Sequence, residues 1–193
     1  MSVSRRSWLI VPGARGPSAA RRDDAVVGLD PFDAGARVDF WWRQPKRFRQ
    51  EWLLEADGRA VASMKGEPIF SRTSRVRFTD AAFEARRGWT GNLEVRAEGA
   101  VEPLARLFAR WSGGRVETPS GDTLALTPIG FWHRAYELRT EDGNVLVRLE
   151  SHDGFSRHEV QVYFEDPVRR RTDLRPLLVL MAAVVFAPKR HSS

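Results

Sequence analysis

The middle of the chain, from Val38 to Phe164, alternates apolar and polar residues with a period of two. Residues 93–98, for example, place Leu, Val and Ala between Glu, Arg and Glu. Such alternation is typical of antiparallel strands that bury one face, because successive side chains of a strand point to opposite sides. Dipeptides that favour hairpin turns, such as Asp57-Gly58 and Asp142-Gly143, separate the alternating stretches. The pattern therefore predicts a mainly β protein.

Twelve strands can be placed on this pattern, and short strands spaced by about 8–12 residues indicate a sandwich or a barrel. The expected spans are 37–43, 47–56, 59–65, 72–79, 82–88, 92–98, 103–111, 114–118, 122–127, 132–140, 144–151 and 157–165. Leu104–Trp111 leaves two possibilities open, a strand or a short helix, because its large apolar residues also fall on one helical face.

The last apolar segment, Leu177–Ala187, has no charged residue. As a helix it would extend only about 17 Å, against about 30 Å for the hydrocarbon core of a bilayer. The segment therefore favours a buried helix over a membrane-inserted one, which stays as the alternative. Asp173 and Pro176 suit the start of such a helix, and Pro188 ends it.

A sheet of this size tends to close, because closure removes unpaired edges, and a barrel of about twelve strands is too wide to be filled by its own side chains. A helix that is apolar on all sides would fill the space. We therefore expect a closed antiparallel barrel of about twelve strands around a central C-terminal helix at about 174–187. The expected organisation is a flexible basic tail over 1–35, one domain over 36–188 and a short tail over 189–193. Large apolar residues that could line the barrel are Phe40, Trp42, Trp52, Phe83, Trp89, Trp111, Trp132 and Phe164.

This arrangement resembles the tubby-like barrel superfamily, which includes tubby C-terminal domains, the plant LURP-one-related proteins and the phospholipid scramblases. The resemblance covers about residues 37–188. It rests on two aromatic–hairpin units, Trp52–Val61 and Tyr136–Val147, on the late strand His158–Phe164, and on the terminal apolar segment Leu174–Ala187. It implies a twelve-stranded barrel around a hydrophobic C-terminal helix, with phosphoinositide binding or lipid transfer among the functions. The chain lacks the cysteine-rich segment and the calcium-loop character of scramblases, and no stretch matches the basic pocket of tubby domains.

The net charge of +6 is concentrated at the two ends of the sequence. Residues 1–24 carry +3 and residues 167–193 carry +5, whereas residues 25–166 carry −2. Nucleic-acid-binding domains usually carry a basic patch on the folded body, so no specific nucleic acid is expected. Only three of the 31 cations are lysines. Arginine enrichment has two explanations that stay open, a GC-rich coding sequence and the binding of phosphate groups, which arginine contacts through two parallel hydrogen bonds.

Two basic clusters are the candidate contacts for an anionic ligand. One lies beside Trp41 and Trp42, and the other directly precedes the apolar segment. Arginine together with tryptophan suits an anionic membrane interface, while a solvated loop is the alternative. The candidate residues are Arg43, Lys46, Arg47 and Arg49 in the first cluster and Arg169, Arg170 and Arg171 in the second.

No motif for catalysis, metal binding or cofactor binding is present in the sequence. The chain has no cysteine, no Gly-x-Ser-x-Gly elbow and no phosphate-binding glycine loop. His152 and His158 flank a turn, but their spacing matches no metal-binding pattern. We therefore expect a protein that is not an enzyme and that needs no metal or cofactor.

The leading functional hypothesis is a binding module for an anionic lipid or a phosphorylated ligand, with the basic clusters at one barrel end. Alternatives are a barrel that binds a protein partner, a scramblase-like protein whose terminal helix inserts into the membrane, and a lipocalin-like carrier with that helix outside. The apolar run Trp8–Val11 is too short for a secretory signal. We therefore expect a cytoplasmic protein, peripheral to the membrane if it binds lipid.

Overall fold

The structure is a computed structural model that describes residues 28–36, 38–45, 50–66, 72–110, 113–130, 135–152, 159–166 and 168–186. Twelve strands, one short 3-10 helix and one α-helix are described in this part of the chain. In order they are β1 (Phe40–Arg43), β2 (Glu51–Ala56), β3 (Arg59–Gly66), β4 (Thr73–Phe78), β5 (Ala82–Arg87), β6 (Leu93–Ala97), β7 (Pro103–Arg110), β8 (Gly113–Glu117), β9 (Thr123–Ile129), β10 (Ala135–Thr140), β11 (Val145–Ser151), β12 (Glu159–Phe164), η1 (Val168–Arg170) and α1 (Leu174–Val185).

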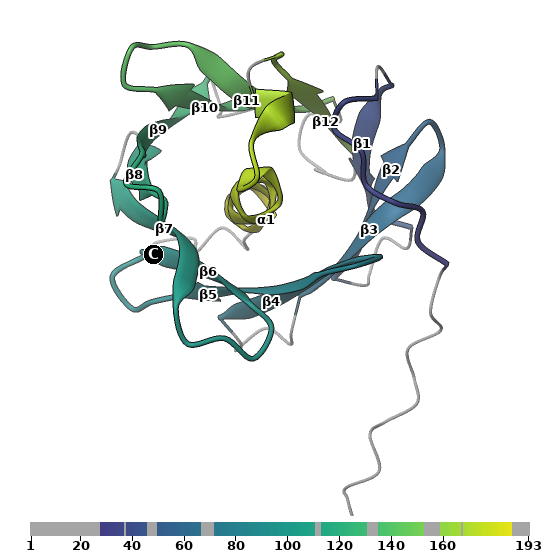
Figure 1. Cartoon of the computed structure of the whole chain (residues 1–193), viewed down its shortest axis with the longest axis horizontal. Coiled ribbons are helices and arrows are strands. Elements are labelled where there is room, and N and C mark those ends of the chain that lie inside the picture. Colours follow the sequence, from purple (N-terminus) through teal and green to yellow (C-terminus); the bar gives the residue numbers. More distant parts are fainter. Residues whose placement is uncertain are drawn as a thin grey trace, which may run out of the picture.

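The strands form one closed antiparallel barrel in which each strand pairs with its neighbours in the sequence (Figure 1). β1 closes the ring by pairing with β12, where Trp42 lies opposite Val160. The prediction of a closed barrel of about twelve strands is confirmed. The segment with two possible structures is a strand, β7, because Leu107 alternates with outward-facing neighbours and pairs with Leu93 of β6.

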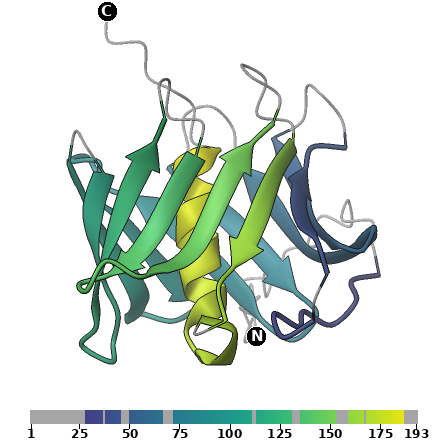
Figure 2. The same ribbon diagram turned by 90° about the horizontal axis from the view of Figure 1, so that it is seen from above.

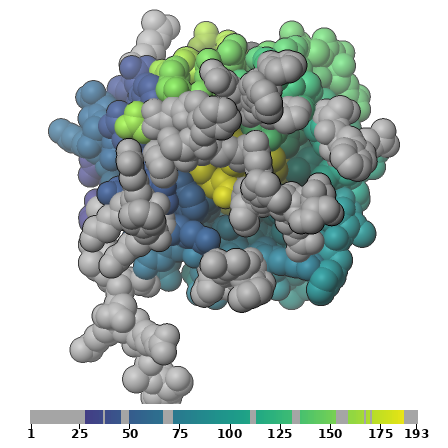
Figure 3. All heavy atoms as spheres, turned by 180° about the vertical axis from the view of Figure 1, so that it is seen from behind, coloured from purple at the N-terminus to yellow at the C-terminus, as the bar shows by residue number. Residues whose placement is uncertain are grey.

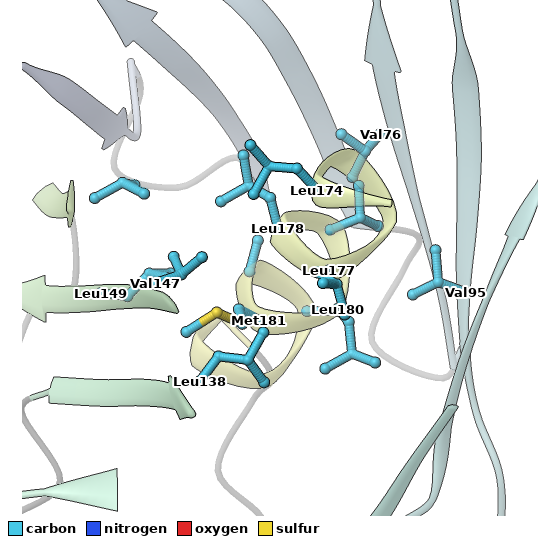
Figure 4. Close-up of a cluster of buried hydrophobic side chains, with 14 of the residues drawn as sticks. Val76, Val95, Leu138, Val147, Leu149, Leu174, Leu177, Leu178, Leu180 and Met181 are labelled. Carbon is cyan, nitrogen blue, oxygen red and sulfur yellow. The ribbon is translucent and has the colours of Figure 1, made fainter. Parts of the chain in front are cut away.

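α1 lies inside the barrel, as predicted (Figures 1 and 2). Ten of its twelve residues are buried, and Leu178 and Met181 are fully buried. Inward-facing residues of the strands, among them Val76, Leu138 and Val147, surround the helix (Figure 4). The helix therefore fills the barrel, which excludes a lipocalin-like arrangement with the helix outside. No helix among the described residues is long and apolar enough to span a membrane.

The two ends of the barrel contain different connections and opposite ends of α1. At the lower end in Figure 2, α1 begins and the turns after β2, β4, β6, β8 and β10 are found. At the upper end α1 finishes, and the connections after β1, β3, β5, β7, β9 and β11 are found. At this upper end Arg87 donates a hydrogen bond of 3.3 Å to the carbonyl oxygen of Ala183. A cation at the last turn of a helix stabilises it through the unpaired carbonyls and the helix dipole.

The outer wall of the barrel carries charged residues of both signs in compensating positions. Glu94 on β6 contacts Arg96 at 2.5 Å and Arg106 on β7 at 3.4 Å. Glu84 on β5 receives a hydrogen bond of 2.7 Å from Arg86, which holds the pKa of this carboxyl below its usual range. Of these, Glu94 and Arg106 lie opposite each other on neighbouring strands, an arrangement that stabilises a sheet by about 0.2–1 kcal/mol per pair.

Residues 28–36 are packed across the lower end of the barrel, although the sequence assigned most of them to a flexible tail. The ring of Phe32 lies 5.4–6.1 Å from the rings of Phe40, Phe78 and Phe164. The Thr79 hydroxyl donates to two carbonyl oxygens of this segment at 2.9–3.0 Å. This segment belongs to the domain, because Phe32 packs against the core and side chains of the barrel hydrogen-bond to its backbone; the composition of the segment did not indicate either.

Candidate functional site

The two predicted basic clusters lie at opposite ends of the barrel. Arg43 ends β1 at the upper end, whereas Arg169 and Arg171 lie between β12 and α1 at the lower end. α1, about 18 Å long at 1.5 Å per residue, extends between these two ends (Figure 2). The side chains of Lys46, Arg47, Arg49 and Arg170 lie outside the described residues.

Arg169 is used to hold the packed N-terminal segment. Its Nη1 donates to the carbonyl oxygens of Ala34 and Ala36, the second at 2.9 Å. Its Nε lies 3.7 Å from the carboxylate of Asp166. These contacts give Arg169 a structural role at the lower end.

Arg171 connects the start of α1 with the barrel wall. Its Nε and Nη2 donate to the two carboxylate oxygens of Asp173 at 2.8 and 2.7 Å, and Nη2 also donates to Asp122 in the turn after β8 at 2.6 Å. These hydrogen bonds raise the pKa of Arg171 and hold the pKa of Asp122 below its usual range. Because Asp173 is bound to Arg171, its side chain does not cap α1 as the sequence suggested.

Arg43 is paired with carboxylates but remains partly accessible at the upper end. Its guanidinium lies 2.9 Å from Glu55 on β2 and 3.4 Å from Glu159 on β12, and 42% of the side chain is exposed. The same guanidinium lies 5.4 Å from the ring centroid of Trp41. The Trp41 ring also lies 5.2 Å, between centroids, from the ring of His152. Arginine and tryptophan therefore do meet at this position.

The sequence missed a second arginine–tryptophan pair at the same end. Trp89, in the turn between β5 and β6, is 89% exposed. The guanidinium carbon of Arg72 lies 3.3 Å from the centroid of its ring. The available signal was the Gly88-Trp89-Thr90-Gly91 sequence, which puts an indole inside a tight turn rather than in a strand.

The other predicted lining residues follow the expected pattern where they are described. Phe40, Trp42, Phe83 and Phe164 are buried, and Trp52 is packed against the core. Trp89 does not line the barrel, since it belongs to a turn. Trp111 and Trp132 lie outside the described residues.

An aromatic cluster closes the barrel interior at the upper end. The rings of Trp52 and Phe186 are stacked with centroids 4.9 Å apart, and Trp42 meets Phe186 edge-on at 6.0 Å. Among the described residues, neither indole N–H has a hydrogen-bond partner. Figure 3 looks at this end, and the last turn of α1 is visible in the middle of the barrel mouth.

A pocket of about 610 Å³ lies at the lower end, between the first turn of α1 and the barrel wall. Its lining combines apolar residues from β5 and β7 with polar residues from the turn after β8 and the start of α1. The lining residues are Phe83, Leu104, Pro119, Ser120, Asp122, Arg171, Thr172, Asp173, Arg175 and Pro176.

Within the described part of the chain, no group of three or more His, Asp or Glu side chains is placed to hold a metal ion. His158 and the segment that joins it to His152 lie outside that part. Several carboxylates near the two barrel ends instead contact arginine nitrogens at 2.6–3.4 Å, namely those of Glu55, Asp80, Asp122, Glu159 and Asp173.

No protein-family model, curated protein or solved structure matches the chain. The resemblance to tubby-like barrels therefore stays a prediction of family. The architecture that it implied, a barrel around a C-terminal helix, is present.

Proposed function

We propose that the protein is a non-enzymatic binding module that attaches to an anionic lipid surface through the upper end of its barrel. The observation that carries the proposal is the Trp89 indole, 89% exposed in a turn at this end, with the Arg72 guanidinium 3.3 Å from its ring centroid. Tryptophan prefers the boundary between water and lipid, because its ring is apolar and its N–H is polar.

The charge at this end supports the same proposal. Arg72 belongs to the upper end, and β1 ends and β2 begins there. That connection contains Lys46, Arg47 and Arg49. Each basic residue near an anionic leaflet contributes about 1 kcal/mol, so a handful gives reversible, salt-sensitive attachment.

The proposal differs from scramblase-like insertion in what happens to α1. Insertion would require the fully buried residues of α1 to leave a closed barrel, at the cost of the barrel core. Surface attachment through Trp89 leaves the barrel intact. The two mechanisms therefore predict opposite responses to salt.

Flotation of the full chain with vesicles tests the proposal, using phosphatidylcholine alone and phosphatidylcholine with phosphatidylserine, at low and high salt. We expect binding to the anionic vesicles only, lost at high salt. Trp89→Ala and Arg72→Ala should each weaken it about fivefold, in line with about 1 kcal/mol per contact.

Matched controls come from the lower end. Val101 is 81% exposed and the Arg59 side chain is 79% exposed. Val101→Ala and Arg59→Ala should bind like the unmodified chain. Salt-resistant binding to both vesicle types would indicate that α1 inserts, and an absence of binding would favour a protein partner; either result overturns the proposal.

A further inference from the structure

We infer that the barrel binds the anionic leaflet tilted onto the outer wall of β4–β8, rather than upright on its upper end. The inference rests on the proposed function and adds the orientation of the bound protein. Two features of this wall carry it, an excess of arginine and the position of Trp89 at the upper edge.

The outward-facing charges of the barrel are divided between two sides. Among the side chains that the structure describes, six arginines and three glutamates face outward from β4–β8, which gives this wall a charge of +3. The arginines are Arg75, Arg77, Arg86, Arg96, Arg106 and Arg115. On the opposite wall, formed by β10–β12 with β1 and β2, five glutamates outnumber three arginines, which gives −2. β3 and β9 lie between the two walls.

The carboxylates of the β4–β8 wall lie beneath its guanidinium groups. Glu84 is only 12% exposed, whereas Arg75 and Arg86, which both contact it, are 51% and 56% exposed. Glu94 is shared in the same way, and its partner Arg106 is the more exposed of the two. A surface that approaches this wall therefore meets guanidinium groups first, and phosphate groups are acceptors that arginine contacts well.

Trp89 lies at the upper edge of the same wall. It belongs to the turn between β5 and β6, and Arg72, which stacks on its ring, directly precedes β4. The backbone N–H of Arg87 donates to the carbonyl oxygen of Arg72 at 2.8 Å, so the pairing of β4 with β5 continues to this edge. A tilt toward β4–β8 therefore brings the arginines to the headgroups while Trp89 stays at the interface.

Upright attachment would leave much of this charge without effect. β4 and β5 have six residues each and extend about 20 Å at about 3.3 Å per residue. At physiological ionic strength, charges attract a leaflet over a Debye length of about 8 Å. Only a tilted barrel places the lower part of the wall within this distance.

Single cysteines that carry a fluorescent label test the orientation, because the chain has no cysteine of its own. Ala82→Cys places the label on the β4–β8 wall at the lower end, and Gln161→Cys places it on the opposite wall, nearer the upper end. The labelled full chain is bound to phosphatidylcholine–phosphatidylserine vesicles that contain a lipid with a nitroxide quencher on its headgroup. We expect the label at position 82 to be quenched about twofold or more relative to the label at position 161. Equal quenching, or stronger quenching at position 161 as upright attachment predicts, would overturn the inference.

Removing one cation from each wall gives a second readout. Arg106→Gln and Arg148→Gln are matched, because both arginines are about half exposed and each shares a glutamate with another arginine. Arg106→Gln should weaken binding to the anionic vesicles about fivefold. Arg148→Gln lies on the wall that faces away and should change binding by less than about twofold.

The outcomes separate a wrong orientation from a wrong function. Thermal melting checks that every variant is folded. Equal losses in Arg106→Gln and Arg148→Gln would overturn the orientation and leave the proposed attachment in place. Failure of the unmodified chain to float with anionic vesicles would overturn the proposed function, and the orientation with it.

Discussion

Arg171 and Asp122 are joined by a hydrogen bond of 2.6 Å, although they are 49 positions apart in the sequence. Asp122 lies in the turn after β8, and Arg171 lies just before α1. The same guanidinium also donates hydrogen bonds to Asp173, the residue that directly precedes the helix. The pair therefore fixes where α1 enters the barrel.

Replacing Arg171 should destabilise the protein. Arg171→Ala removes hydrogen bonds to two carboxylates, and hydrogen bonds to charged groups contribute about 1.5–3 kcal/mol. We expect a loss of about 1–3 kcal/mol in the free energy of unfolding, measured by urea denaturation. Arg59→Ala, whose partner Asp30 is 3.6 Å away on an exposed surface, should change it by less than about 0.5 kcal/mol. Equal effects of the two variants would contradict the structural role of Arg171.

Acid should destabilise the protein partly through two carboxylates at the lower end. Hydrogen bonds from Arg175 and Arg171 hold the pKa values of Asp80 and Asp122 below the usual value. A carboxyl whose pKa is lower in the folded state stabilises that state above its unfolded pKa, about 3.9, and the contribution is lost as the pH falls through the lowered value. The free energy of unfolding should therefore decrease from about pH 4 downward.

The double variant Asp80→Asn/Asp122→Asn provides the comparison. It should be less stable than the unmodified chain at pH 6 and should show a flatter dependence on pH below about 4. Urea denaturation across this pH range measures both curves. Parallel curves would show that other carboxylates determine the acid response.

Two glycines with positive φ should respond differently to alanine. A Cβ on Gly113, where φ is +120°, would lie 2.0 Å from the carbonyl oxygen of Leu126, which is backbone of the neighbouring strand. Gly99, with φ of +80°, has no atom within 4 Å of the same position. Gly113→Ala should therefore cost about 3 kcal/mol or more, or prevent folding, whereas Gly99→Ala should cost about 1–2 kcal/mol. Thermal melting of both variants distinguishes a steric clash from backbone strain alone.

The central helix should be most sensitive to cavities at its fully buried positions. Leu178 is fully buried between α1 and the strands, while Val184 is only partly buried. Leu178→Ala should cost about 2–5 kcal/mol, because the rigid barrel cannot collapse into the cavity. Val184→Ala should cost about 1 kcal/mol or less. Similar losses in urea denaturation would mean that the barrel is not closely packed around the helix.

The sequence was sufficient to predict the fold because two local patterns specify it. The period-two alternation placed all twelve strands within a few residues, and the uncharged run at 177–187 lay within or just beyond α1. The closure of the sheet into a barrel was predicted from the number of strands and from the presence of an apolar helix that could fill the barrel interior. The packing of Phe32 could not be predicted, since one aromatic side chain in a polar segment gives no periodic signal.

The candidate site could be predicted only in part, because charge along the sequence does not show which partner an arginine has. Arg169 and Arg171 looked like free cations, but the fold brings carbonyl oxygens and Asp122 to them from distant positions. Trp89 was predicted to line the barrel, but it lies in the turn between β5 and β6 and is exposed to solvent. The number of strands between two clusters determines which barrel end each occupies, so the twelve strands placed from the sequence were already enough to assign Arg43 and Arg171 to opposite ends.

The pairing of β1 with β12, which sets Phe40 opposite Val162, also determines the order in which the molecule can assemble. The hairpins from β2 to β11 form from adjacent segments. The pairing of β1 with β12 can form only after β12, which is synthesised much later than β1. Contacts between such distant segments form slowly, because a long loop must close before they stabilise anything. α1 follows even β12 in the chain, so the barrel must stay open, with its apolar inner face exposed to water, until the helix that fills it has been made.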